Sequence, residues 1–124
     1  MTRPPARSPA AAEHYVWSGD AGVRCDGWHL VRAAGLSVIQ ERMPPRRARR
    51  ATATRARQFF YAIAGRLDFE VEGVAHALRP DTGLEVAPGL AHQPANRGPE
   101  PAEFVVVSQP PSHGDREAAP AADA

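Results

Sequence analysis

The chain has 124 residues, of which 43% are hydrophobic, and its formal net charge is +1. This length is enough for one domain with a core of its own, and the near-neutral charge gives no indication of a nucleic acid or an acidic membrane surface as a partner. A single cysteine, Cys25, excludes an internal disulfide and gives no support to an oxidising compartment, so we expect a cytoplasmic protein.

The two ends of the chain differ in composition from the middle. Residues 1–14 are rich in Pro, Ala and Arg and are predicted to form a disordered lead-in. They lack the apolar stretch of a secretory signal, and no apolar run in the chain is long enough to span a membrane. Residues 117–124 have a similar composition and are predicted to form a disordered tail. We therefore expect one domain over residues 15–116.

Between these ends, apolar and polar residues alternate with a period of two, which indicates strands. The clearest case is 67–72, in which Leu67, Phe69 and Val71 alternate with three carboxylates. The predicted strands, in chain order, are 36–39, 58–63, 67–72, 74–78, 84–86 and 104–107. The last of these is β-branched and suits a strand that is buried on both faces. Thirteen prolines and ten glycines supply frequent turns, so the pattern predicts an antiparallel sandwich or barrel.

An arginine-rich run interrupts this pattern at residues 46–57, which contain six arginines. The run has no apolar stripe that would indicate an amphipathic helix. Six cations could bind phosphate or nucleic acid, but no aromatic side chains are interleaved with them to stack on bases. We therefore predict a solvated, partly mobile loop and no nucleic-acid partner.

Two segments resemble the conserved motifs of the cupin superfamily. Residues 81–96 are similar to the second motif, G-x5-P-x-G-x2-H-x3-N, with Gly89, His92 and Asn96 in register and departures at the leading Gly and the first Pro. Residues 58–65 resemble the second half of the first motif, G-x5-H-x-H-x3–4-E-x6-G, with Gln58 at the Glu position. The resemblance covers residues 15–116 and implies an all-β, antiparallel double-stranded β-helix, which is a jelly-roll barrel around a small pocket.

The resemblance also implies where a metal would bind. In this family two His of the first motif, a Glu or Gln, and the His of the second motif form a site for Fe, Mn, Ni or Zn. Counting back from Gln58 places the two first-motif histidines at Ala51 and Ala53, or at Thr52 and Thr54 with the shorter spacer. Only His92 remains, with Gln58 as a weak second ligand, so we expect a degenerate metal site and no resident cofactor. Either the histidines were lost by substitution, or a compensated pair of frameshifts replaced them.

The candidate ligand-binding residues are Gln58, Phe60, His92 and Asn96. Alternation puts Phe60 on the same face as Gln58, while Phe59 and Tyr61 face the other way. His14, His29 and His113 lack ligand spacing and receive no role, and His76, in phase with the apolar residues of the 74–78 strand, is predicted to be a surface or hydrogen-bonded histidine and not a ligand. We expect a cupin that binds a small molecule in its barrel. The alternative is a metal-dependent cupin enzyme, of the dioxygenase or isomerase type, with His92 as a ligand. Cupins often dimerise, so the resemblance is also compatible with a homodimer.

Overall fold

The computed structural model describes residues 8–18, 24–49, 51–111 and 117–118, and these form an almost entirely β structure. A 3-10 turn at Pro9–Ala11 comes before the first strand. The strands are β1 (Glu13–Ser18), β2 (Arg24–Arg32), β3 (Ser37–Met43), β4 (Arg47–Ala48), β5 (Thr52–Ala53), β6 (Arg57–Ala64), β7 (Leu67–Val71), β8 (Val74–Leu78), β9 (Gly83–Val86), β10 (His92–Asn96), β11 (Ala102–Gln109) and β12 (Glu117–Ala118).

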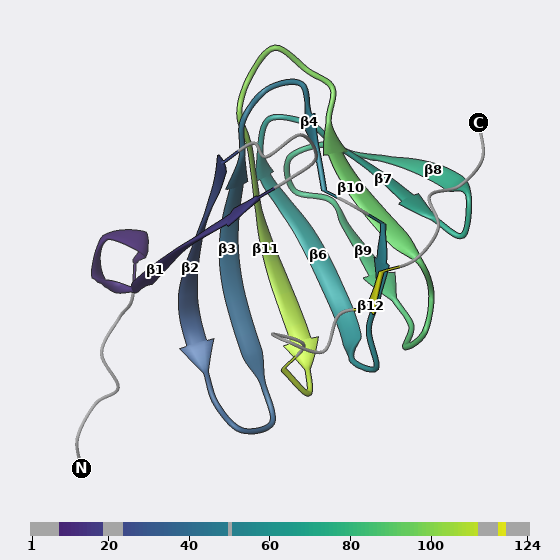
Figure 1. The fold of residues 1–124 in the computed structure, drawn as a ribbon. Helices are drawn as coiled ribbons and strands as arrows, with labels where there is room; N and C mark the ends of the chain where they lie inside the picture. Colours follow the sequence, from purple (N-terminus) through teal and green to yellow (C-terminus); the bar gives the residue numbers. More distant parts are fainter. Residues whose placement is uncertain (1–7, 19–23, 50, 112–116, 119–124) are drawn as a thin grey trace.

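These strands form two sheets, which we call sheet A and sheet B. Sheet A has the order β1-β2-β3-β11-β6-β9, and sheet B has the order β12-β5-β10-β7-β8 with β4 beside β10. Every described pairing is antiparallel. The sheets face each other (Figure 1), and Phe60 of sheet A meets Phe69 of sheet B with ring centroids 4.5 Å apart. The predicted antiparallel, all-β jelly-roll barrel is confirmed.

The core lies between the inner faces of the two sheets. It consists of Cys25, Met43, Phe60, Ala62, Leu67, Phe69, Leu78, Val86, Ala102, Phe104 and Val106. Leu67 and Phe69 of β7 are fully buried, and the acidic residues between and after them are half-buried on the other face. The alternation in this strand is therefore confirmed.

Strand β11 departs from the expectation that it is buried on both faces. Its residues alternate between buried and half-buried from Ala102 to Ser108, so only one face of the strand is enclosed. The reason is that β11 lies inside sheet A, between β3 and β6. Its inner face therefore packs in the barrel while its outer face looks away from sheet B.

The prediction of a solvated loop over the arginine run was wrong for part of that run. Strands β4 and β5 lie within it and pair with β10, and Arg49 is only 8% exposed. The physical reason is that a buried carboxylate, Glu41, accepts a hydrogen bond from the Arg49 guanidinium at 2.9 Å. Arg50 lies outside the described residues.

The first and the last described strands extend into the segments predicted as the lead-in and the tail. Strand β1 begins at Glu13, inside the predicted lead-in, and pairs along its length with β2. Residues 117–118 of the predicted tail form β12 beside β5. The rest of the predicted tail and residues 1–7 lie outside the described residues. No helix in the described ranges has the length and apolar character needed to cross a membrane.

Candidate functional site

A histidine and two phenylalanines meet inside the barrel. His92, at the start of β10, is 5% exposed. Its ring centroid lies 5.6 Å from that of Phe60 and 5.8 Å from that of Phe69, with the Phe69 ring stacked on the imidazole. The His92 Nδ1 lies 3.0 Å from the carbonyl oxygen of Leu90. Because a carbonyl can only accept, Nδ1 is the donor, and in the neutral ring Nε2 is then the acceptor.

Gln58 and Phe60 lie on the same inner face of β6, as the alternation predicted. The Gln58 side chain is 1% exposed, and its Nε2 donates to the hydroxyl of Ser108 on β11 at 3.0 Å. Register places Gln58 opposite Ser108 and Val86 on the neighbouring strands. The structure therefore brings Gln58, Phe60 and His92 into the same interior.

Asn96 is fully buried, and its amide is occupied by loop backbone. Its Nδ2 lies 3.1 Å from the carbonyl oxygen of Met43, 3.2 Å from that of Pro44 and 2.7 Å from that of Glu100. Its Oδ1 accepts from the backbone N–H of Gly98 at 3.0 Å. These contacts tie the end of β3 to the end of β10, so they assign Asn96 a structural role.

The positions of the missing histidines lie beside His92. Thr52 of β5 pairs directly with His92 in sheet B, which favours the shorter spacing of the first motif. Thr54 is buried, and its hydroxyl donates to the carbonyl of Ala56 at 3.2 Å. In the described part of the chain no three His, Cys, Asp or Glu side chains are grouped to hold a metal ion. An imidazole, an amide and threonine hydroxyls do not fit the donor set of the metal centre that the resemblance implies.

A buried ion pair that the sequence analysis missed lies on the inner face of sheet A. Glu41 of β3 is 0% exposed. Its Oε2 accepts from the hydroxyl of Tyr15 at 2.9 Å and from Nη2 of Arg49 at 2.9 Å. The Arg49 guanidinium in turn lies 3.9 Å from the ring centroid of Trp17, a cation–π contact. Alternation along β3 could have placed Glu41 inside, because Ile39 and Met43 flank it on the same face.

Strand β1 supplies two aromatic side chains to this ion pair. The Tyr15 ring packs over Gly27 of β2, where any Cβ would overlap its carbon atoms. The rings of Tyr15 and the buried His29 have centroids 4.8 Å apart. Glu41 pairs with Gly27 across β2 and β3, so the glycine makes the space through which the Tyr15 hydroxyl reaches the carboxylate.

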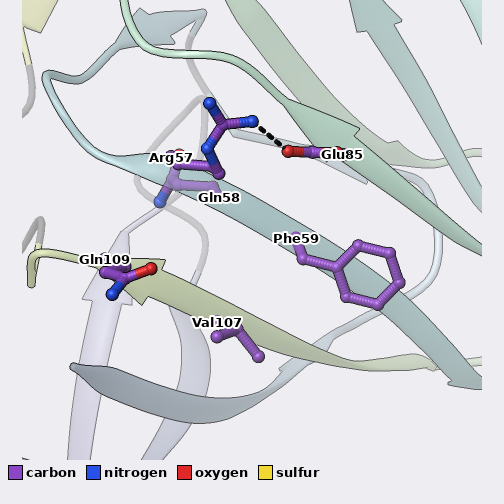
Figure 2. A pocket seen from close by; sticks show the side chains of 6 residues that line it. All are labelled: Arg57, Gln58, Phe59, Glu85, Val107 and Gln109. Atoms are coloured by element: carbon purple, nitrogen blue, oxygen red, sulfur yellow. Dashed lines mark hydrogen bonds and ion pairs between the residues drawn. The ribbon is translucent and has the colours of Figure 1, made fainter.

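The outer face of sheet A carries a shallow hollow (Figure 2). Its volume is about 110 Å³, and it is lined by Arg57, Gln58, Phe59, Glu85, Val107 and Gln109. Arg57 and Glu85 form an ion pair at one side, and Phe59 is 40% exposed at the other. The hollow therefore combines a neutralised charge pair with an apolar wall.

Comparison with known proteins identifies a family that this chain matches. A family model described as "Cupin domain" matches residues 40–108. No curated protein matches the chain. Among solved structures, the polyketide cyclase RemF from Streptomyces resistomycificus has a TM-score of 0.78 at 11% identity, covering 98% of this chain and 89% of that one. An uncharacterized protein with a double-stranded beta-helix domain from Klebsiella pneumoniae has a TM-score of 0.76 at 18% identity, covering 96% and 100%.

A predicted oxalate decarboxylase from Thermotoga maritima is also similar, with a TM-score of 0.76 at 14% identity, covering 86% of this chain and 100% of that one. At such low identities these likenesses establish the double-stranded β-helix fold alone. Reaction and substrate have to be argued from the residues of the site, because one fold hosts many chemistries.

Proposed function

This chain belongs to the cupin domain family, and we propose that its barrel binds a small molecule without the metal that this family often holds. The observation that carries the proposal is the arrangement around His92. Its imidazole is fixed by the Leu90 carbonyl and packs against the rings of both Phe60 and Phe69. An oriented polar group within aromatic walls is typical of small-molecule sites. A cytoplasmic location is part of this proposal, supported by the single cysteine.

The donor set around His92 disfavours the alternative, a metal-dependent dioxygenase or isomerase. A catalytic transition metal needs several imidazole or carboxylate ligands, and β5 offers Thr52 opposite His92 instead. Gln58 supplies an amide whose nitrogen is hydrogen-bonded to Ser108. Some structural neighbours are described as enzymes, but at 14% and 11% identity they support the fold and not a shared reaction.

Elemental analysis of the purified protein tests this proposal. We expect the native chain to contain far less than one Fe, Mn, Ni or Zn per chain. The double variant Thr52→His/Thr54→His is expected to approach one metal per chain, because it restores imidazoles beside His92. Ala75→His/Ala77→His is the control, since it places the same pair on the exposed residues of β8. A native chain that already holds one metal would contradict the proposal and favour the enzyme.

We further propose that two copies pair through the outer face of sheet A. Its apolar face consists of Val38, Phe59, Tyr61, Ile63, Val105 and Val107, which are half-buried or exposed in one chain. An Arg42–Glu103 pair lies at one end of this face and an Arg57–Glu85 pair at the other. Each end of this face thus carries one positive and one negative side chain. A second copy related by a twofold axis can therefore place opposite charges against each other.

A further inference from the structure

We propose that Glu41 binds a hydrogen-bond donor of the molecule that enters the barrel. The ligand is then a neutral or cationic compound with a hydroxyl or amino group on a flat, apolar body. This inference rests on the proposed small-molecule binding and adds a specificity-determining residue that the family motifs do not contain.

The two oxygens of Glu41 differ in their surroundings. Oε2 accepts from Tyr15 and Arg49, whereas Oε1 is buried without a hydrogen-bond partner among the described residues. A buried carboxylate oxygen that has lost water and gained no donor destabilises the folded state. A ligand that donates a hydrogen bond to Oε1 removes this penalty. A ligand that has only hydrogen-bond acceptors cannot bond to this oxygen.

Charge decides which ligands are suited to this position. Arg49 neutralises Glu41 in a pair whose side chains are 10% and 1% exposed. From β1, Tyr15 donates to the carboxylate, and Trp17 lies against the Arg49 guanidinium. The Trp17 Nε1 is also buried without a partner in the described part of the chain. A ligand donor can therefore bond to Oε1, whereas an anionic group placed there would meet the lone pairs of a carboxylate that Arg49 has already neutralised.

Register places Glu41 on the same inner face as the aromatic cluster. Ile39 of β3, Val106 of β11 and Phe60 of β6 are paired across three neighbouring strands. Glu41 is the next inward residue after Ile39, so strand geometry puts its Cα about 12 Å from that of Phe60. Because both side chains extend inward, we infer that a molecule of two fused rings with its polar group at Glu41 is long enough to reach the aromatic cluster, passing beside Phe104, which lies opposite Glu41 on β11.

Matched naphthalene probes test the inference on the purified full-length protein by ligand-detected NMR titration. 2-Naphthol donates a hydrogen bond, and 2-methoxynaphthalene has a similar shape but only accepts. We expect 2-naphthol to bind the native protein at least about tenfold more tightly, as for one hydrogen bond to a charged group. 2-Naphthoate, an anion, is expected to bind more weakly than 2-naphthol.

Glu41→Gln keeps the shape of the side chain and replaces one acceptor by a donor. In this variant the preference for 2-naphthol over 2-methoxynaphthalene should fall to within about twofold, and 2-naphthoate should gain affinity because Arg49 is no longer neutralised. Glu103→Gln on the outer face is the control and should keep the native preference. If Glu41→Gln fails to fold, Tyr15→Phe keeps the ring over Gly27 and removes one donor to the carboxylate. The preference for 2-naphthol should then rise severalfold.

Equal binding of the two neutral probes to the native protein would overturn the role of Glu41 and leave small-molecule binding intact. So would an unchanged preference in Glu41→Gln or in Tyr15→Phe. A crystal structure with 2-naphthol bound and only water at Glu41 Oε1 would overturn it as well. If no naphthalene binds, the Glu41 inference falls, and the metal analysis decides separately whether the metal-free barrel proposal also falls.

Discussion

Gly27 lies inside β2, where glycine normally weakens a strand. Here its missing side chain makes room for Tyr15, whose ring carbons a Cβ at this position would overlap. We expect Gly27→Ala to lower the free energy of unfolding by about 1–3 kcal/mol, because the ring must move away from Glu41. Urea denaturation measures this loss. Gly35→Ala is the control, since no atom lies within 4 Å of a Cβ there. An equal loss in both variants would show that the Tyr15 contact does not matter.

At the same scale, the sequence predicted one half of the candidate site. Gln58, Phe60 and His92 could be found because a motif and a period of two both point to them. Glu41 and Arg49 were missed because a charged residue is usually read as solvent-facing. Burial of either charge is tolerable only when the opposite charge is its partner. Glu41 and Arg49 become partners only when the fold brings β3 against the segment that follows β4.

Strand β10 ends at Asn96, whose amide joins it to the loop after β3. We expect Asn96→Asp to lower the free energy of unfolding by about 2–4 kcal/mol at neutral pH. The variant removes the N–H donors and places a carboxylate against the backbone carbonyls of Met43, Pro44 and Glu100. Thermal and urea unfolding measure the effect.

The control for Asn96 is Gln93→Glu, which makes the same amide-to-acid change at a half-buried position of the same strand. Because Gln93 lies opposite Glu70 of β7, the new carboxylate meets a like charge and should cost up to about 1 kcal/mol, still less than Asn96→Asp. If both variants lose the same stability, the connection between the two loops contributes little, and Asn96 becomes available for the ligand role that the family motif implied.

Among the strands, those with alternating aliphatic residues were predictable, and β10 and β2 were not. The inward residues of β10 include His92, Pro94 and Asn96, and a proline and two polar residues do not give an apolar period. Gly27 and His29 conceal the inner face of β2 in the same way. In both strands the apolar alternation is broken by residues that line the interior or hydrogen-bond to loop backbone. The strand pattern is therefore weakest near the candidate site.

On the scale of the whole molecule, the two sheets differ in their outer faces. Sheet B presents half-buried polar residues such as Asp68, Glu70 and Gln93, as expected for a face toward water. Sheet A presents the apolar face defined above, with Phe59 and Ile63 each 40% exposed. The sequence could predict the barrel, because motif spacing and strand pattern agree. It could not predict this asymmetry, because the apolar face combines residues from three strands that are distant in the chain.

Sedimentation velocity tests whether a second copy covers this face. We expect the native chain to sediment as a dimer. Phe59→Glu is expected to weaken the dimer at least about tenfold, because it places a charge within the apolar centre of the interface. Since Phe59 also packs over Gly83, Ile63→Glu provides a second variant with the same expected result. Val74→Glu is the control, because Val74 is 59% exposed on sheet B. A native monomer, or a dimer that only the control disrupts, would show that sheet A does not form the interface.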